Sequence, residues 1–115
     1  MSSYPGHLLR IFLTENDRHE GKPLHEWIVQ EARRRGLAGA TVLRGLEGFG
    51  AGSRLHTAKV LRLSQDLPVV IEIVDAQAKI DALLEHLEGM VGDGLVTLEP
   101  VRVIRYRGTD PAARG

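Results

Sequence analysis

Two stretches of the chain place apolar residues three and four positions apart, the spacing that gathers them on one face of an α-helix. The first stretch begins at Pro23, a residue suited to the first helical turn, and ends at Gly36. The second follows Asp75, which we expect to be the N-cap, and ends at the Gly-Asp-Gly segment of residues 92–94. The pattern therefore predicts two amphipathic helices, whose apolar faces carry Leu24, Trp27, Ile28 and Ala32, and Ile80, Leu83, Leu84, Leu87 and Val91.

Shorter apolar runs predict the strands, because they are too short for helices. The clearest runs are Leu8 to Leu13 and Val69 to Val74. A strand at Gly39 to Glu47 is expected to pair with Ala58 to Leu63, and the last strand is expected in two parts, Leu95 to Leu98 and, beyond Pro100, Val101 to Tyr106. The order β-α-β-β-α-β predicts an α+β, ferredoxin-like fold, in which two helices cover one face of an antiparallel sheet.

Large apolar side chains fall on both faces of this predicted sheet. Alternate residues of a strand point to opposite faces. One face would carry Leu8, Phe12, Val70, Val74, Ile104 and Tyr106, and the other Leu9, Leu13, Val69, Ile71, Ile73 and Val103. Because two helices cover only one face, we expect the second face to be covered by further copies of the chain.

Composition narrows the class of protein. The 115 residues suit one domain, residues 1–115, in which Gly108 to Gly115 is expected to be a disordered tail. The 15 basic and 15 acidic side chains cancel, so no overall charge attracts nucleic acid. The chain has no cysteine, which excludes disulfides and thiolate chemistry. With no apolar stretch long enough to cross a membrane, the sequence predicts a cytoplasmic protein.

Motifs for catalysis and metal binding are missing from the sequence. It has no GxxxxGK[ST] phosphate loop, no HExxH zinc helix and no GxSxG nucleophile elbow. Its five histidines do not pair at metal-ligand spacing. We therefore predict neither catalytic residues nor metal ligands, and a protein that is not an enzyme.

Three features remain as candidates for binding an anion. The first is the glycine-rich segment from Gly48 to Gly52, followed by Arg54 and His56, because closely spaced glycines let backbone N–H groups surround an anion. The second is Gly-Asp-Gly at residues 92–94. The third is the pair Arg105 and Arg107, which would lie on one face of the sheet, with Arg102 on the other. Their two guanidinium groups could hydrogen-bond the same phosphate. Each has a purely structural alternative: a mobile hairpin, a helix end with its turn, and a charged edge strand.

Taken together, these segments resemble the PII signalling superfamily. GATVLRGLEGFG is similar to the PII segment at the base of its mobile loop, VGDGLV to the turn before the following strand, and VRVIRYRGTD to the arginine-bearing C-terminal strand. The order and spacing agree from Leu8 to Asp110. Within the superfamily, GLAGATV, GFGAGSRLHT and LPVVIEIVD most resemble an uncharacterised PII-like branch.

The resemblance implies a homotrimer that binds an adenine nucleotide between subunits. It places Thr41, Gly48, Phe49 and Gly50 on one side of the ligand, Gly92, Asp93 and Gly94 over it, and Arg105 and Arg107 of a neighbour on its phosphates. It also implies that the mobile loop Gly50 to Thr57, with Gly52, Ser53, Arg54 and His56, signals to a protein partner. A membrane channel or transporter is one candidate partner.

Some positions depart from the family pattern. Leu95 replaces the basic residue that follows the Gly-Asp-Gly turn, and Gly52 replaces a glutamine that helps to hold magnesium and 2-oxoglutarate. No tyrosine stands in the loop for nucleotidylation. These departures weigh against ATP with magnesium and 2-oxoglutarate, and leave open ATP alone, ADP, AMP, a cyclic dinucleotide or another small anion.

Two other functions on the same fold stay open. One is a trimeric metal-binding protein of the copper-tolerance type, which would need histidines or carboxylates to converge across subunits. The other is a small enzyme on a ferredoxin-like barrel, a monooxygenase or isomerase, with Tyr106 as its only evident pocket residue. The fold alone does not decide between these functions and a regulator.

Overall fold

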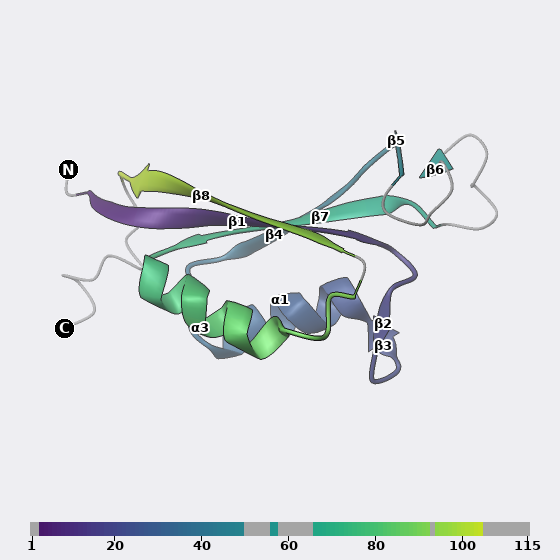
Figure 1. Ribbon diagram of the computed structural model, residues 1–115, viewed down its shortest axis with the longest axis horizontal. Helices are drawn as coiled ribbons and strands as arrows, with labels where there is room; N and C mark the ends of the chain where they lie inside the picture. The colour runs from purple at the N-terminus through teal and green to yellow at the C-terminus, as the bar shows by residue number, and fades with distance from the viewer. Residues whose placement is uncertain (1–2, 50–55, 58–65, 93, 105–115) are drawn as a thin grey trace.

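The computed structural model describes residues 3–49, 56–57, 66–92 and 94–104. Its elements follow in the order β1 (Tyr4–Thr14), β2 (Arg18–His19), β3 (Lys22–Pro23), α1 (Leu24–Arg34), β4 (Ala40–Arg44), β5 (Glu47–Gly48), β6 (His56–Thr57), β7 (Pro68–Asp75), α3 (Gln77–Leu87) and β8 (Leu95–Val103) (Figure 1). No helix in these ranges is long and apolar enough to cross a membrane.

Four strands form the main sheet, in the order β4-β7-β1-β8. All neighbours in it are antiparallel, and the register places Leu9 of β1 opposite both Ile73 of β7 and Leu98 of β8. Helix α1 separates the first two strands of this sheet along the chain, and α3 separates the last two. This is the predicted βαββαβ, ferredoxin-like arrangement.

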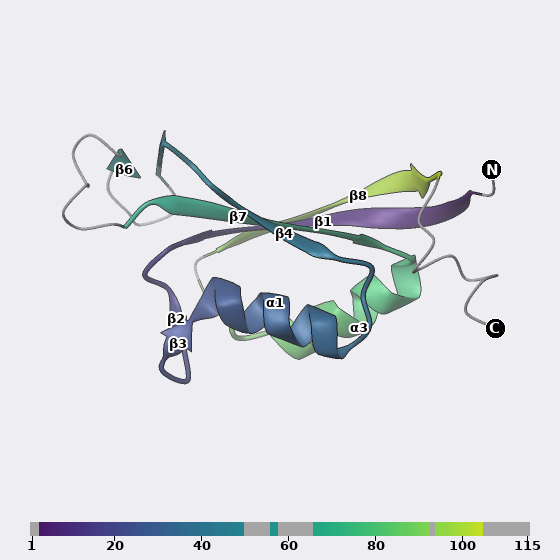
Figure 2. The same cartoon turned by 180° about the vertical axis from the view of Figure 1, so that it is seen from behind.

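Both helices lie on the same side of the sheet, as the front and back views show (Figures 1 and 2). The buried core fills the space between these two layers. It consists of Leu9, Ile11, Leu13, Val69, Ile71 and Ile73 from the sheet, and Leu24, Ile28, Ala32, Ile80, Leu83 and Leu87 from the helices. The predicted helical faces are therefore confirmed, as is the alternation predicted for the strands around Leu9 and Ile71. The prediction that Val103 shares their face is wrong, because Val103 lies opposite Tyr4 in the register and so shares the face of Phe12, away from the helices.

One strand prediction differs from the structure, and another is not tested by it. Strand β4 pairs with β7, while its predicted partner, residues 58–63, lies outside the described residues. The last strand is continuous from Leu95 to Val103 and passes through Pro100. Proline is tolerated there because β8 is an edge strand. On the side of β8 away from β1 no neighbouring strand of the described sheet needs a hydrogen bond from the missing N–H.

Asp75 does not cap α3 as predicted. It is the last residue of β7, and Ala76 occupies the N-cap position without a side-chain cap. Asp75 is 1% exposed, and its carboxylate accepts hydrogen bonds from the N–H groups of Ala38, at 2.9 Å, and Ala76, at 2.7 Å. These two hydrogen bonds tie the segment after α1 to the start of α3. They also satisfy the carboxylate, which would be costly to bury without hydrogen-bond partners.

Candidate functional site

The glycine-containing segment after β4 lies directly on the start of β7. The N–H of Gly45 donates to the Pro68 carbonyl at 2.8 Å. A Cβ on Gly45 would stand 2.9 Å from Pro68 Cγ, and a Cβ on Gly48 would stand 3.3 Å from the same atom. Glycine is therefore needed at Gly45 for the chain to pass this close, and β5 can then pair Gly48 with His56 of β6.

An ion pair between Arg44 and Glu15 fixes the base of this segment. The Arg44 side chain is 67% exposed, whereas that of Glu15 is 13% exposed. The Glu15 N–H also donates to the Leu67 carbonyl at 2.9 Å. No pattern in the sequence predicted this pair, because the two residues meet only through the pairing of β4, β7 and β1.

The turn between α3 and β8 lies on β1. Gly92 has a φ of +58°, a conformation that favours glycine. At Gly94 a Cβ would stand 2.6 Å from Val91 Cγ1 and 2.9 Å from the carbonyl oxygen of Phe12. The fold itself therefore favours glycine at both positions. The close contact at Gly94 holds the start of β8 against Phe12.

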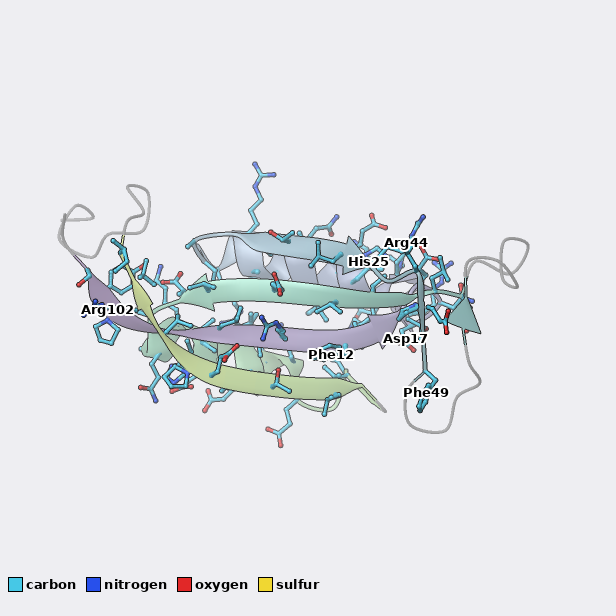
Figure 3. The ribbon with its side chains drawn as sticks, turned by 90° about the horizontal axis from the view of Figure 1, so that it is seen from above. Phe12, Asp17, His25, Arg44, Phe49 and Arg102 are labelled. Atoms are coloured by element: carbon cyan, nitrogen blue, oxygen red, sulfur yellow. The ribbon has the colours of Figure 1, made fainter. Side chains whose placement is uncertain are left out.

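Both glycine-containing segments meet at one end of the sheet. The register places Pro68 opposite Thr14 and Leu95 opposite Phe12, so the two segments lie within three residues of each other along β1. Seen from the side opposite the helices, Phe12 and Phe49 lie at this same end (Figure 3). The structure thus places the regions of Gly48, Phe49, Gly92 and Gly94 at the same end of the sheet.

We call the side of the sheet opposite the helices the open face. At the end with the two glycine segments, one row of apolar side chains crosses all four strands: Leu43, Val70, Phe12 and Leu95. Leu43 is 49% exposed and Leu95 60% exposed. The prediction of an apolar second face is therefore confirmed for the described residues, and this row offers a flat apolar floor at the candidate site.

A cluster of three charged side chains lies next to the apolar row, and no pattern in the sequence predicted it. Arg10 donates from Nε to Glu72 Oε2 at 2.9 Å, and from Nη1 to Glu99 Oε1 at 2.7 Å. The hydrogen bond to Glu72, and then that to Glu99, raise the pKa of Arg10. The three residues come from β7, β1 and β8, so only the strand register could have revealed them.

The remaining predicted residues are placed only in part. Thr41 lies exposed on β4, opposite Glu72 in the register. For His56 the structure describes the backbone in β6. The other predicted residues lie outside the described residues: Gly50, Gly52, Ser53, Arg54, Asp93, Arg105 and Arg107.

Arg102 lies exposed on β8, at the end of the sheet away from Phe49 (Figure 3). The strand from Leu95 to Val103 spans about 27 Å. A fully extended chain from Val103 to Arg107 reaches at most about 14 Å. The reach from Val103 to Arg107 is therefore about half the length of β8.

Comparison with known families agrees with this architecture. A family model described as "Uncharacterized ACR, COG1993" (DUF190) matches residues 6–103. The chain belongs to the DUF190 family. A UPF0166 protein of Aquifex aeolicus (strain VF5) is 44% identical over 97 residues, which cover 84% of this chain and 91% of that protein.

Several solved structures similar to this DUF190 protein are described as PII-like. CPII, a nitrogen regulatory PII-like protein from Thiomonas intermedia K12 bound to ADP, AMP and bicarbonate, has a TM-score of 0.70 at 21% identity, covering 90% of this chain and 92% of CPII. A putative PII-like signalling protein from Thermus thermophilus has a TM-score of 0.65 at 20% identity, covering 91% and 95% of the two chains. At these identities the likeness establishes a PII-like fold, and the predicted resemblance is confirmed.

Proposed function

We propose that this DUF190 protein is a PII-like regulator, and not an enzyme, that binds an adenine nucleotide or a similar small anion between the subunits of a homotrimer. Thr41, Gly48, Phe49 and Gly50 line one side of the ligand, and residues 92–94 close over it. Arg105 and Arg107 of a neighbouring subunit contact its phosphates, and the loop from Gly50 to Thr57 carries the signal to a protein partner.

One observation carries this proposal: the two glycine-containing segments, far apart in the sequence, meet at the end of β1 beside the apolar row of the open face. Gly48 packs against Pro68 and Gly94 against Phe12, and this close packing holds both backbone segments at the same end of the sheet. The apolar row, with Phe49 76% exposed beside it, suits the flat face of a purine. The row and Phe49 thus provide an apolar surface for a base.

The reach of the C-terminal strand supports a site between subunits. Because the reach from Val103 to Arg107 is about half the length of β8, a contact of Arg107 with the glycine segments would come from a neighbouring subunit. The exposed apolar row on the open face supports the same assembly, because association removes it from water. A trimer therefore both covers the sheet and completes the phosphate site.

The charges at the site favour a ligand with few phosphates. Leu95 provides no cation beside the turn, and the described Arg44 is already paired with Glu15. CPII, whose fold is similar, was solved with ADP, AMP and bicarbonate. We therefore expect AMP or ADP, alone or with bicarbonate, to bind more tightly than ATP.

Titration calorimetry and thermal unfolding test this proposal directly. The wild-type protein is measured with AMP, ADP, ATP and a cyclic dinucleotide, each with and without bicarbonate. A true ligand at 100 times its dissociation constant stabilises the fold by about 2.7 kcal/mol. Stabilisation by AMP or ADP supports the proposal. Failure of every phosphate-bearing ligand to bind would overturn it.

A further inference from the structure

A groove lies between α3 and β8, on the helix side of the sheet and so away from the open face. Its volume is about 770 Å³, within the range of sites for small organic ligands. The floor is apolar and is made by Ile11, Leu84, Leu87, Val91 and Val96. The groove borders the turn with Gly92 and Gly94, but its apolar floor is not part of the proposed nucleotide site.

Three carboxylates stand along one wall of this groove. Asp81, Glu85 and Glu88 are spaced four and three residues apart, which aligns them on the face of α3 that borders the groove. All three are exposed, and none makes an ion pair or hydrogen bond with another described residue. No lysine or arginine is among the described residues that line the groove.

The stability of α3 does not explain this arrangement. Like charges four residues apart repel each other on a helix surface. Carboxylates are also disfavoured near a helix C-terminus, yet Glu85 lies in the last turn, Glu88 is the C-cap, and the first turn has no acidic residue. The wall therefore carries negative charge where helix electrostatics oppose it, and a cation bound in the groove would relieve both effects.

We propose that this groove binds a linear aliphatic diamine or polyamine. The methylene chain of such a molecule would cover the apolar floor, and its ammonium groups would pair with the carboxylates. A bare metal ion fits less well, because no three histidine, aspartate or glutamate side chains among the described residues are placed to hold one. The proposal does not depend on nucleotide binding.

Titration calorimetry on the wild-type chain at low ionic strength, without nucleotide, tests the ligand class. The probes are 1,5-diaminopentane and spermidine, and the matched control is 1,5-pentanediol, which has the same length without charge. We expect both amines to bind, spermidine more tightly, and the diol not to bind. Equal binding of diol and diamine would overturn the proposal, as would binding of a lysine-rich peptide but of neither amine.

Variants of the carboxylate wall test the location. The double substitution Asp81→Asn with Glu85→Gln should weaken spermidine binding about 25-fold, at about fivefold for each exposed carboxylate. The free double variant should be at least as stable as the wild type, because repulsion is removed. Glu26→Gln, which removes an exposed carboxylate on α1, is the control and should leave the affinity unchanged.

A second variant changes the floor of the groove. Val96→Lys places an ammonium group from β8 beside the carboxylates, so it should also reduce spermidine binding by about fivefold or more. In NMR spectra of the wild type, spermidine should shift the methyl signals of Leu84, Val91 and Val96. Unchanged affinity in the double variant and in Val96→Lys, or shifts confined to other residues, would overturn the location.

Discussion

Gly94 lies directly against the main chain of Phe12, where a Cβ would stand 2.9 Å from the Phe12 carbonyl oxygen. This contact fixes the distance between the turn that follows α3 and the central strand β1. The carbonyl cannot move without disturbing the pairing of β1 with β8. Any side chain at this position must therefore displace the turn, and with it one wall of the proposed nucleotide site.

We accordingly expect Gly94→Ala to lower the free energy of unfolding by about 1–3 kcal/mol, the usual cost of overpacking. It should also weaken nucleotide binding, because the turn moves away from the ligand. Chemical denaturation and calorimetry measure the two effects. The matched control is Gly39→Ala, since a Cβ there would have nothing within 4 Å. Equal stability of Gly94→Ala and Gly39→Ala would contradict the packing argument.

Replacing Arg105 or Arg107 by alanine should weaken nucleotide binding about ten- to a hundredfold, because a charge-assisted hydrogen bond to phosphate contributes about 1.5–3 kcal/mol. Arg102→Ala, in the exposed part of β8, is the control and should change the affinity little. Calorimetry on the three variants and the wild type decides the question. The same affinity in all four proteins would rule out the arginine contact.

The assembly of the protein provides another test. Light scattering coupled to size exclusion should give three times the chain mass for the wild type. Val74→Lys places a charge on the open face away from the glycine segments and should dissociate the trimer, because the charge would be buried without a partner. Ala82→Lys, on the exposed side of α3, should leave the mass unchanged. A wild-type monomer at micromolar concentration would refute both the trimer and the site between subunits.

The stability of the fold should depend on Glu31 at low pH. Glu31 is 7% exposed and accepts hydrogen bonds from Arg34 and Arg35, and the Nε2 atom of His86 lies 3.4 Å away. The hydrogen bond from Arg34, more than any other interaction, holds the pKa of this carboxyl below its ordinary value near 4.5. A lowered pKa in the folded state stabilises the protein above the unfolded value, and this stabilisation is lost as pH falls through the folded pKa.

Thermal unfolding between pH 7 and pH 2 measures this effect. Glu31→Gln should be less stable than the wild type at pH 7, and the difference should shrink below about pH 4.5. The exposed Glu26→Gln serves as the control and should show a smaller change with pH. A difference between Glu31→Gln and the wild type that stays constant with pH would contradict the assignment.

Local periodicity was enough to predict the helices and most of the sheet. The repeat from Ile80 to Leu87 and the alternation from Val69 to Val74 each determine their own element, because a single face is buried. The prediction of a two-part last strand was wrong because a proline such as Pro100 interrupts a strand only where the sheet needs an N–H donor at that position. The sequence could also show that three candidate segments exist, but only a family resemblance could join them.

The missed features all depend on which strands are neighbours. Arg10 and Glu99 are 89 residues apart, and they meet because β8 returns beside β1. The pair of Arg44 and Glu15 likewise requires β4 to lie beside β7. The carboxylate spacing on α3 is visible in the sequence, but the groove beside it becomes apparent only when β8 is in place.

Pro100 has a consequence for how copies of this chain can join. A nine-residue edge strand such as β8 presents a row of backbone groups on which another chain could extend the sheet. Proline contributes no donor to that row, so a strand added along its whole length would meet a gap. This interruption opposes open-ended fibres and leaves closed assemblies with a fixed number of subunits as the favoured outcome.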